Sequence, residues 1–157
     1  MTPATNFLPR DPNFDARCRD SFSRQPFMAH LGASLVELRP GFAEIRLPFA
    51  PFVRQQHGYV HGGAIASVLD SAAGYAAFSL MPADATVLTV EYKLNFVNPG
   101  EGEAVIARGR VVKSGRTLSV VQADAYARTG GKEVLIATSI QTLMALLGRD
   151  DTASAKA

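Results

Sequence analysis

The segment from His61 to Leu80 has the apolar spacing of a long helix, and no other part of the chain shows this pattern over such a length. Hydrophobic residues recur there three and four positions apart, as they do along one face of a helix. The opposite face carries small residues and a single carboxylate. The apolar face consists of Ile65, Val68, Leu69, Ala72, Ala73 and Ala76, and the small-residue stripe of Gly63, Ser67, Asp70, Gly74 and Ala77. A single helix of this kind must bury its apolar face against strands.

Most of the remaining chain has the alternation of apolar and polar residues that is typical of half-buried strands. The turns between them are indicated by glycine and proline. The pattern predicts strands over 33–38, 43–48, 86–97, 104–112, 118–127 and 134–144, with turns at 39–41, 114–115 and 130–131. We expect the last four strands to form an antiparallel meander with the helix lying across the sheet, which is an α+β fold. Because the helix is apolar around much of its circumference, we also expect a second copy of the chain to cover part of it.

With 157 residues, of which 47% are hydrophobic, the chain fits one globular domain. We place this domain at 14–147, after an irregular N-terminal arm at 1–13 and before a polar tail at 148–157 that we expect to be disordered. A short helix is expected at the start of the domain, and Pro26 should end it. The residues expected near one side of that helix are Phe14, Cys18, Phe22 and Phe27.

Charge and composition exclude several classes of function. A formal net charge of +2, with scattered basic residues, argues against nucleic acid as the main partner. No segment approaches the roughly 20 apolar residues that span a bilayer, so we expect a soluble, cytoplasmic protein with no membrane partner. Cys18 is the only cysteine, which excludes an internal disulfide. The spacing of His30, His57 and Asp70 matches no metal-ligand pattern, so no metal site is expected.

The start of the helix and its one acid are the candidates for chemistry. His61-Gly62-Gly63 stands where the backbone N–H groups of a helix have no partner within it, and such donors can hold an oxygen that carries negative charge. Inside a helix an Asp costs about 0.5 kcal/mol against Ala, so local structure alone does not explain Asp70. The alternatives are that the glycines only permit a tight start to the helix, and that Asp70 is a solvated or ion-paired acid.

At these residues the chain resembles the hotdog-fold thioesterases, in particular the phenylacetate-pathway-like branch, over roughly residues 27–144. In that family an Asn is followed six residues later by His-Gly-Gly and, nine residues after the His, by an Asp or Glu on the central helix. His61-Gly62-Gly63 and Asp70 hold those places here. The chain departs from the family at Gln55, which stands where the family has Asn.

The resemblance implies a hotdog fold, in which an antiparallel sheet wraps around one long central helix, and a homodimer that often pairs again into a homotetramer. It implies hydrolysis of acyl thioesters of coenzyme A with no metal or prosthetic group as cofactor. In the family mechanism the backbone N–H after the His, here that of Gly62, holds the carbonyl oxygen, and the acid of the facing subunit, here Asp70, attacks or activates water. Thr89 stands where several members place a Ser or Thr near this water. The active site is then shared between chains.

The physical requirements of the reaction agree with this assignment. A thioester needs little help for its leaving group and mainly requires a polarised carbonyl and a nucleophile. One backbone donor aimed at the developing oxyanion is typically worth about 3 to 4 kcal/mol, and glycine permits close approach of a substrate. Gly62 and Asp70 would supply these two requirements, with Asp70 as base or nucleophile.

Further residues are candidates for binding and positioning the substrate. The Gln55 amide would hold the attacking water or the thioester. We interpret His61, together with Gly63, as fixing the substrate loop rather than as a general base, because no Ser or Cys nucleophile stands nearby. Arg116, in a basic cluster beside the turn at 114–115, would meet the nucleotide phosphates of coenzyme A. Tyr59, Phe78 and Met81 would line the acyl channel. The alternatives are a solvated hairpin for Arg116 and ordinary core positions for the others.

Our main hypothesis is therefore an acyl-CoA thioesterase that works as a symmetric homo-oligomer. The alternative is a noncatalytic acyl-CoA sensor or scaffold on the same fold, because fold does not determine chemistry and Gln55 departs from the family pattern. A hotdog dehydratase is a third option. It would need a His and an acid arranged to move protons at adjacent carbons, and the His61-Gly62-Gly63 start argues against it.

Overall fold

The structure, a computed structural model, describes residues 6–149 and 151. The central helix α3 has 17 residues, whereas α1 has 10 and α2 has 6, which confirms the prediction of one long helix. Among the described residues, no helix is long and apolar enough to span a membrane. In chain order the elements are α1 (Phe14–Ser23), α2 (Pro26–Leu31), β1 (Ser34–Arg39), β2 (Phe42–Pro48), the 3-10 helix η1 (Pro51–Val53), α3 (Gly62–Phe78), β3 (Ala85–Phe96), β4 (Ala104–Ser114), β5 (Leu118–Thr129) and β6 (Lys132–Leu147).

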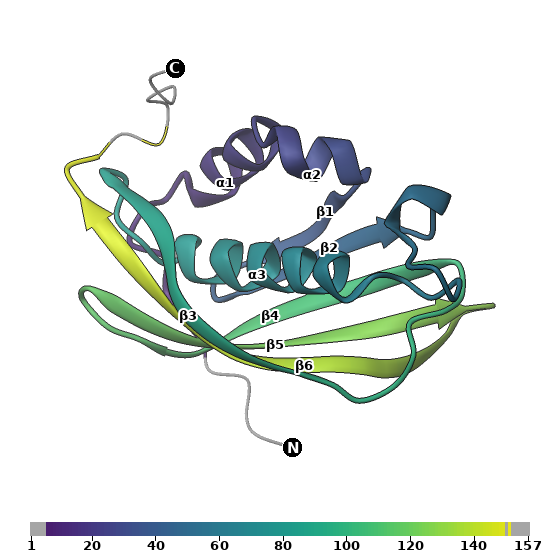
Figure 1. Cartoon of the computed structure of the whole chain (residues 1–157). Helices are drawn as coiled ribbons and strands as arrows, with labels where there is room; N and C mark the ends of the chain where they lie inside the picture. The colour runs from purple at the N-terminus through teal and green to yellow at the C-terminus, as the bar shows by residue number, and fades with distance from the viewer. Residues whose placement is uncertain (1–5, 150, 152–157) are drawn as a thin grey trace.

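The six strands form one antiparallel sheet in the order β1-β2-β4-β5-β6-β3. The sheet curves around α3, and α1 and α2 lie on the other side of that helix (Figure 1). The predicted α+β architecture, an antiparallel sheet wrapped around one central helix, is confirmed.

The predicted meander is right for β4, β5 and β6 but wrong for β3. β3 pairs with β6, with Ala85 opposite Leu147 and Phe96 opposite Ala137, and it forms an edge of the sheet. The 16 residues of β6 are enough to pair with β5 on one side and β3 on the other. Alternation in a sequence specifies the two faces of a strand and not its neighbours, which is why the pattern did not reveal this pairing.

The turn between β5 and β6 consists of two glycines. Gly130 and Gly131 have φ angles of 55° and 80°, and they lie between the paired residues Thr129 and Lys132. A two-residue hairpin turn of type I′ needs positive φ at both central positions, which glycine adopts without a steric cost. The predicted turn at 130–131 is confirmed.

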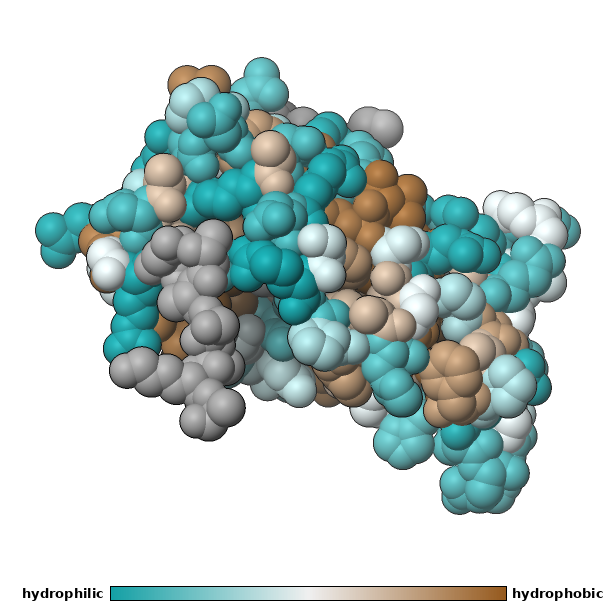
Figure 2. Space-filling view, turned by 90° about the horizontal axis from the view of Figure 1, so that it is seen from above, coloured by the Kyte–Doolittle hydropathy of each residue, from teal (hydrophilic) through white to brown (hydrophobic). Residues whose placement is uncertain are grey.

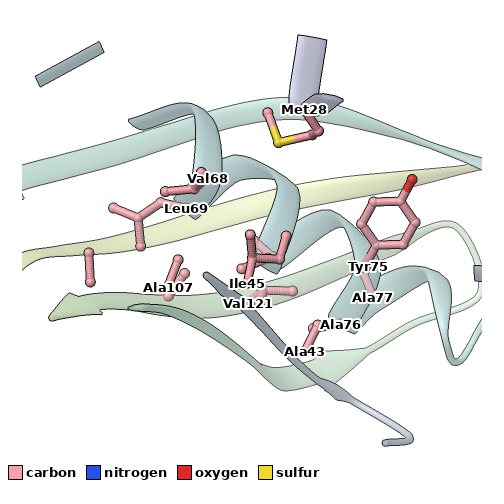
Figure 3. Close-up of a cluster of buried hydrophobic side chains, with 14 of the residues drawn as sticks. Met28, Ala43, Ile45, Val68, Leu69, Tyr75, Ala76, Ala77, Ala107 and Val121 are labelled. Carbon is pink, nitrogen blue, oxygen red and sulfur yellow. The ribbon is translucent and has the colours of Figure 1, made fainter. Parts of the chain in front are cut away.

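α3 packs directly onto β4 at a position without a side chain. A Cβ added to Gly109 would lie 2.3 Å from the carbonyl oxygen of Ala72, so only glycine lets the helix backbone approach this closely. Ala72, Ala73 and Ala76 are fully buried around this contact. Figure 3 shows the surrounding cluster, to which α3 contributes Val68, Leu69 and Tyr75, and the sheet contributes Ile45, Ala107 and Val121. This contact fixes the line of α3 across the sheet.

The small-residue stripe of α3 is partly exposed along one stretch and buried at its C-terminal end. Asp70 and Gly74 are half-buried, whereas Ala77 lies in the core. The apolar face of α3 is buried within the single chain, because α1 and α2 cover the side that the sheet leaves open. The expectation that a second copy must cover α3 therefore rested on a wrong premise. Four of the large apolar side chains left exposed lie on β3, where Leu88, Val90, Tyr92 and Phe96 are between 49% and 56% exposed.

Pro26 ends the first helical stretch, as predicted, and also begins a second helix. Cys18 is fully buried, and Phe14 and Phe22 pack against the core. Phe27, which we expected on the same side, is 55% exposed, because Pro26 starts a new helix with its own spacing. Figure 2 looks down on α1 and α2, where hydrophilic side chains predominate and the hydrophobic ones form separate groups.

The predicted arm and tail are described only in part. Residues 6–13 contain no helix or strand, and the Phe7 ring lies against Gly41. Most of the predicted tail at 148–157 lies outside the described residues. Of its described residues, Asp151 accepts hydrogen bonds from Arg24 Nη2 at 2.8 Å and from Thr86 Oγ1 at 3.0 Å.

Candidate active site

The loop before α3 is held by its own backbone. Its two sides meet in an isolated bridge between Arg54 and Val60. The Gln55 N–H donates to the Tyr59 carbonyl at 2.8 Å, and the Gln55 side-chain oxygen accepts from the His57 N–H. The amide NH2 of Gln55 donates to no protein group within the described residues. Gln55 thus keeps one pair of side-chain donors free, on the loop that leads into the helix.

His61 is the N-cap of α3. Its Nδ1 accepts the Gly63 N–H at 2.8 Å, so this nitrogen is unprotonated and the neutral ring carries its hydrogen on Nε2. Its carbonyl oxygen accepts from the N–H groups of Ala64 and Ile65. The N–H of Gly63, which we expected from the sequence to be free, therefore has a hydrogen-bond acceptor within the chain. The N–H of Gly62 has no acceptor among the described residues, which makes it the available donor of the first turn.

The exposed end of β3 borders Gly62. A Cβ added to Gly62 would lie 3.1 Å from Cζ of Phe96, so the ring rests against the place where a side chain would stand. Phe96 itself is 55% exposed. The surroundings of the Gly62 N–H are therefore apolar on this side, and an apolar neighbour strengthens a hydrogen bond to a developing charge.

Asp70 meets Thr89 across the gap between α3 and β3. Thr89 Oγ1 donates to Asp70 Oδ1 at 2.7 Å, which is a short hydrogen bond to a carboxylate. Thr89 precedes an irregularity in the pairing of β3 with β6, between Thr89 and Glu91. The structure thus brings together two residues that are 19 positions apart in the chain and that the sequence analysis named separately. The second carboxylate oxygen of Asp70 remains for another partner.

Gly62 and Asp70 of one chain lie too far apart to act on the same carbonyl. They are eight residues apart on one straight helix, which corresponds to about 12 Å along the axis. A thioester carbonyl and its attacking nucleophile must lie about 3 Å apart. One chain therefore supplies two separate halves of the predicted site.

A pocket of about 470 Å³ opens beside Asp70. Its walls come from α1, α3, β3, the linker between α1 and α2, and Asp151 after β6. Apart from Gly74, Val87 and Leu88, every lining residue has a polar or charged side chain. The polar lining residues are Ser21, Arg24, Gln25, Asp70, Ser71, Tyr75, Thr89 and Asp151. This volume is in the range of small-molecule sites.

Ser21, Gln25 and Tyr75 form one wall of this pocket, and none of the three was predicted from the sequence as a site residue. Tyr75 is 4% exposed, and burial raises the pKa of its hydroxyl, while hydrogen bonds with Ser21 and Gln25 oppose that shift. A tyrosine in an otherwise aliphatic helical face was the available signal, because a buried phenol needs a hydrogen-bonding partner. The partners lie 50 or more residues away, so the sequence did not identify them.

The remaining predicted residues lie apart from these two half-sites. Arg116 is exposed in the β4–β5 hairpin, at the end of the sheet beside the C-terminal end of α3 and far from Gly62 (Figure 1). Tyr59 is 38% exposed in the loop before α3. Phe78 and Met81, expected in the acyl channel, are buried in the core. Within residues 6–149 and 151, no group of three or more His, Cys, Asp or Glu side chains could hold a metal ion.

Comparison with known proteins assigns the family. The thioesterase superfamily matches residues 57–134. The crystal structure of a thioesterase family protein from Silicibacter pomeroyi is 55% identical, covers 86% of this chain and 99% of its own, and has a TM-score of 0.84. The PaaI protein from the phenylacetic acid degradation operon of Escherichia coli shares the fold, with a TM-score of 0.80 at 17% identity over 90% of this chain and 99% of its own. The medium/long-chain acyl-CoA thioesterase YigI of Escherichia coli is 25% identical over 76% of this chain and 84% of YigI.

The chain belongs to the thioesterase superfamily, and it is a thioester hydrolase with the hotdog fold. The family match begins in the loop before α3 and ends within β6, so it includes Gly62, Asp70 and Thr89 but neither α1 nor α2.

Proposed function

We propose that this protein is an acyl-CoA thioesterase in which two copies of the chain build each active site. The observation that carries the proposal is the short hydrogen bond from Thr89 to Asp70, which orients one carboxylate beside a pocket of substrate size. Likeness to an acyl-CoA thioesterase, YigI, supports coenzyme A as the thiol of the substrate.

The reaction assigns one task to each half-site. The N–H of Gly62 holds the carbonyl oxygen of the thioester and stabilises the negative charge that develops on it. Asp70 Oδ2 of the facing subunit takes a proton from water, whose oxygen attacks the carbonyl carbon. The carbon–sulfur bond then breaks, and the products are a carboxylic acid and the thiol of coenzyme A. Thr89 keeps Asp70 in place through Oδ1.

Asp70 as nucleophile is the second route. Oδ2 would attack the carbonyl carbon directly and form a mixed anhydride as the thiolate leaves. Water would then hydrolyse the anhydride and supply the proton that the thiolate takes up. After a single turnover in ¹⁸O-labelled water, label in Asp70 identifies the nucleophile route. The base route puts the label into the product acid, whereas the nucleophile route with attack of water on the aspartyl carbon puts it into Asp70.

The need for a second subunit follows from distance and exposure. The separation of about 12 Å between Gly62 and Asp70 along α3 requires that the complementary half-site come from elsewhere. β3 is an edge strand with four half-exposed apolar side chains, and such an edge is suited to pairing with another strand. Pairing of β3 with β3 of a second copy would bring Thr89 and Asp70 of one chain toward the partner.

The other candidate residues take supporting roles in this proposal. The free amide NH2 of Gln55 would orient the thioester, while His61 and Gly63 hold the backbone that presents the Gly62 N–H. Tyr59 would flank the opening of the site. Arg116 lies far from Gly62 of its own chain, so its proposed contact with the phosphates of coenzyme A depends on how the two copies are arranged.

The experiment is release of coenzyme A from a panel of aryl-, short-, medium- and long-chain acyl-CoAs. We expect Asp70→Asn to lower kcat at least about 100-fold, because it removes the base or nucleophile. Asp84→Asn, at an exposed acid in the loop after α3, is the matched control and should retain full activity. Full hydrolysis by Asp70→Asn would overturn the assigned role. Binding of acyl-CoA without turnover by wild type would instead favour a noncatalytic sensor.

A further inference from the structure

One wall of the pocket beside Asp70 is a cluster of hydrogen-bonding side chains around the hydroxyl of Tyr75. Gln25 Nε2 donates to Tyr75 Oη at 2.7 Å, and Ser21 Oγ lies 3.2 Å from the same oxygen. All three residues line the pocket. Figure 3 shows Tyr75 with its hydroxyl turned away from α3, toward the side where Met28 of α2 lies.

The hydroxyl hydrogen of Tyr75 has only a long hydrogen bond available to it within the described residues. Gln25 occupies Oη as an acceptor, so the hydrogen of Tyr75 has Ser21 Oγ as its one acceptor among the described residues. The distance of 3.2 Å exceeds the usual 2.5 to 3.0 Å for a hydrogen bond between two oxygens. Burial raises the pKa of Tyr75, so the phenol remains a donor at neutral pH. A buried donor with a weak partner favours an incoming oxygen atom.

The spacing of Asp70 and Tyr75 along α3 sets the approximate length of an acyl chain that would extend from one to the other. Tyr75 follows Asp70 by five residues on α3, which is about 7.5 Å along the axis, or an extended acyl chain of about six carbons. The walls between them are mostly polar, with Val87 and Leu88 as the apolar side chains. A long hydrocarbon chain would lie against this mostly polar wall and exclude water from its polar groups, which is unfavourable where their hydrogen bonds are weak.

Two of the three residues of this wall lie outside the part of the chain that the family model matches. Ser21 is in α1 and Gln25 joins α1 to α2, whereas the family match covers residues 57–134. Tyr75 is within the match, and its two partners come from the segment of α1 and the linker to α2. The N-terminal helices therefore supply groups that can distinguish one acyl thioester from another.

We propose that Tyr75, held by Gln25 and assisted by Ser21, selects thioesters whose acyl chain carries an oxygen function about six atoms from the scissile carbonyl. The proposal rests on the proposed function, since it places the acyl group in the pocket beside Asp70. Tyr75 touches the distal end of the substrate and takes no part in bond breaking.

The test compares two thioesters of equal length, ω-hydroxyhexanoyl-CoA and hexanoyl-CoA. We expect wild type to favour the hydroxylated substrate about tenfold in kcat/KM, the size of effect that one net hydrogen bond gives. Tyr75→Phe should reduce this ratio to near one while leaving hexanoyl-CoA hydrolysis within about twofold. Tyr126→Phe, which removes the hydroxyl of a ring that lies against Arg108 and outside the pocket, should leave the ratio unchanged.

Melting temperatures show that each variant is folded, and Ser21→Ala provides the same readout with a smaller expected decrease if Tyr75→Phe does not fold. No preference in wild type, or an equal loss on both substrates in Tyr75→Phe, would overturn the proposal, because either result means that the acyl end does not reach Tyr75. An equal rise in KM for both would assign the pocket to the coenzyme A arm and also overturn it. Failure of wild type to hydrolyse any acyl-CoA would overturn the proposed function together with this inference.

Discussion

Gly62 occupies the first position of α3, where the backbone geometry suits proline. The first N–H of a helix has no partner within the helix, so its removal costs no helical hydrogen bond. His61 has φ −61° and ψ 135°, an extended conformation that a residue before proline favours. The N–H of Gly62 can therefore be deleted while the helix is retained.

We expect Gly62→Pro to lower kcat about 100- to 1,000-fold, because it removes the donor that would hold the oxyanion. Gly62→Ala is the matched control, since it keeps the N–H and adds the Cβ that would meet Phe96. The measurement is kcat on the best acyl-CoA for wild type and both variants, with melting temperatures to verify folding. Equal activity of the two variants would contradict the role of the N–H.

At the scale of single residues, the sequence was sufficient to identify site residues that lie close together along the chain. His61, Gly62 and Asp70 share one helix and its cap, so helical spacing related them without a structure. The prediction that the Gly63 N–H is free was wrong, because this N–H donates to Nδ1 of His61. The wall at Tyr75 depends on contacts with residues 50 or more positions away, which no local pattern contains.

Arg17 ties α1 to the segment that ends α3 and begins β3. Its guanidinium donates to the carbonyl oxygens of Phe78, Met81, Pro82 and Ala85, at 2.9 to 3.4 Å. Its Nε also lies 2.9 Å from Asp11 Oδ2, in an ion pair whose side chains are 16% and 6% exposed. One planar group thus binds four backbone carbonyls between the last residue of α3 and the first residue of β3.

We expect Arg17→Lys to lower the free energy of unfolding by about 2 to 4 kcal/mol, because an ammonium cannot reach these carbonyls together and Asp11 would lose its close partner. Arg19→Lys is the control, at an arginine of the same helix whose pair with Asp15 is exposed, and it should change stability by less than about 0.5 kcal/mol. Denaturant unfolding measures both. Similar values for the two variants would show that the carbonyl contacts contribute little.

A cluster of ion pairs joins β2, β4, β5 and β6. Arg108 pairs with Glu44 at 2.7 Å and with Glu133 at 2.6 Å, and Arg128 also pairs with Glu133. Hydrogen bonds from Arg108, and then from Arg128, lower the pKa of Glu133 from its ordinary value of 4.5 to about 2, against the opposing effect of burial. Because this pKa is lower in the folded state, Glu133 stabilises the fold above pH 4.5, and the contribution is lost as the pH falls toward 2.

We therefore expect the unfolding free energy of wild type to fall between pH 4.5 and 2 more steeply than that of Glu133→Gln. The variant should be less stable near neutral pH and approach wild type at the acid end. Glu101→Gln, at an exposed position, is the control and should keep the wild-type slope. Denaturant unfolding across this pH range provides the comparison, and parallel curves for wild type and Glu133→Gln would refute the assignment.

The helices and strands themselves were predictable to a large extent, whereas the order in which the strands pair in the sheet was not. The long helix and the strands follow from periods that a short window of sequence contains. The place of β3 beside β6 depends on the length of β6 and on the path of the chain after α3, which periodicity does not encode. That pairing matters for the site, because it sets Thr89 of β3 beside Asp70.

At the scale of the whole molecule, both the site residues and the exposed apolar surface indicate that one chain does not form a complete active site. α3 presents Gly62 at its start and Asp70 about 12 Å further along, each without the group that would complete its chemistry. The large apolar side chains of β3 lie exposed at the edge of the sheet next to Asp70. A second copy paired at this edge would address both features, and a symmetric pair would contain two identical sites.

The most direct test is a hybrid dimer in which one chain carries Asp70→Asn and the other carries Gly62→Pro. Each variant alone should be nearly inactive. With two affinity tags to isolate the hybrid, we expect about half of the wild-type activity per dimer, because one of the two shared sites then combines an intact Gly62 with an intact Asp70. A hybrid no more active than the separate variants would contradict a site built from two chains.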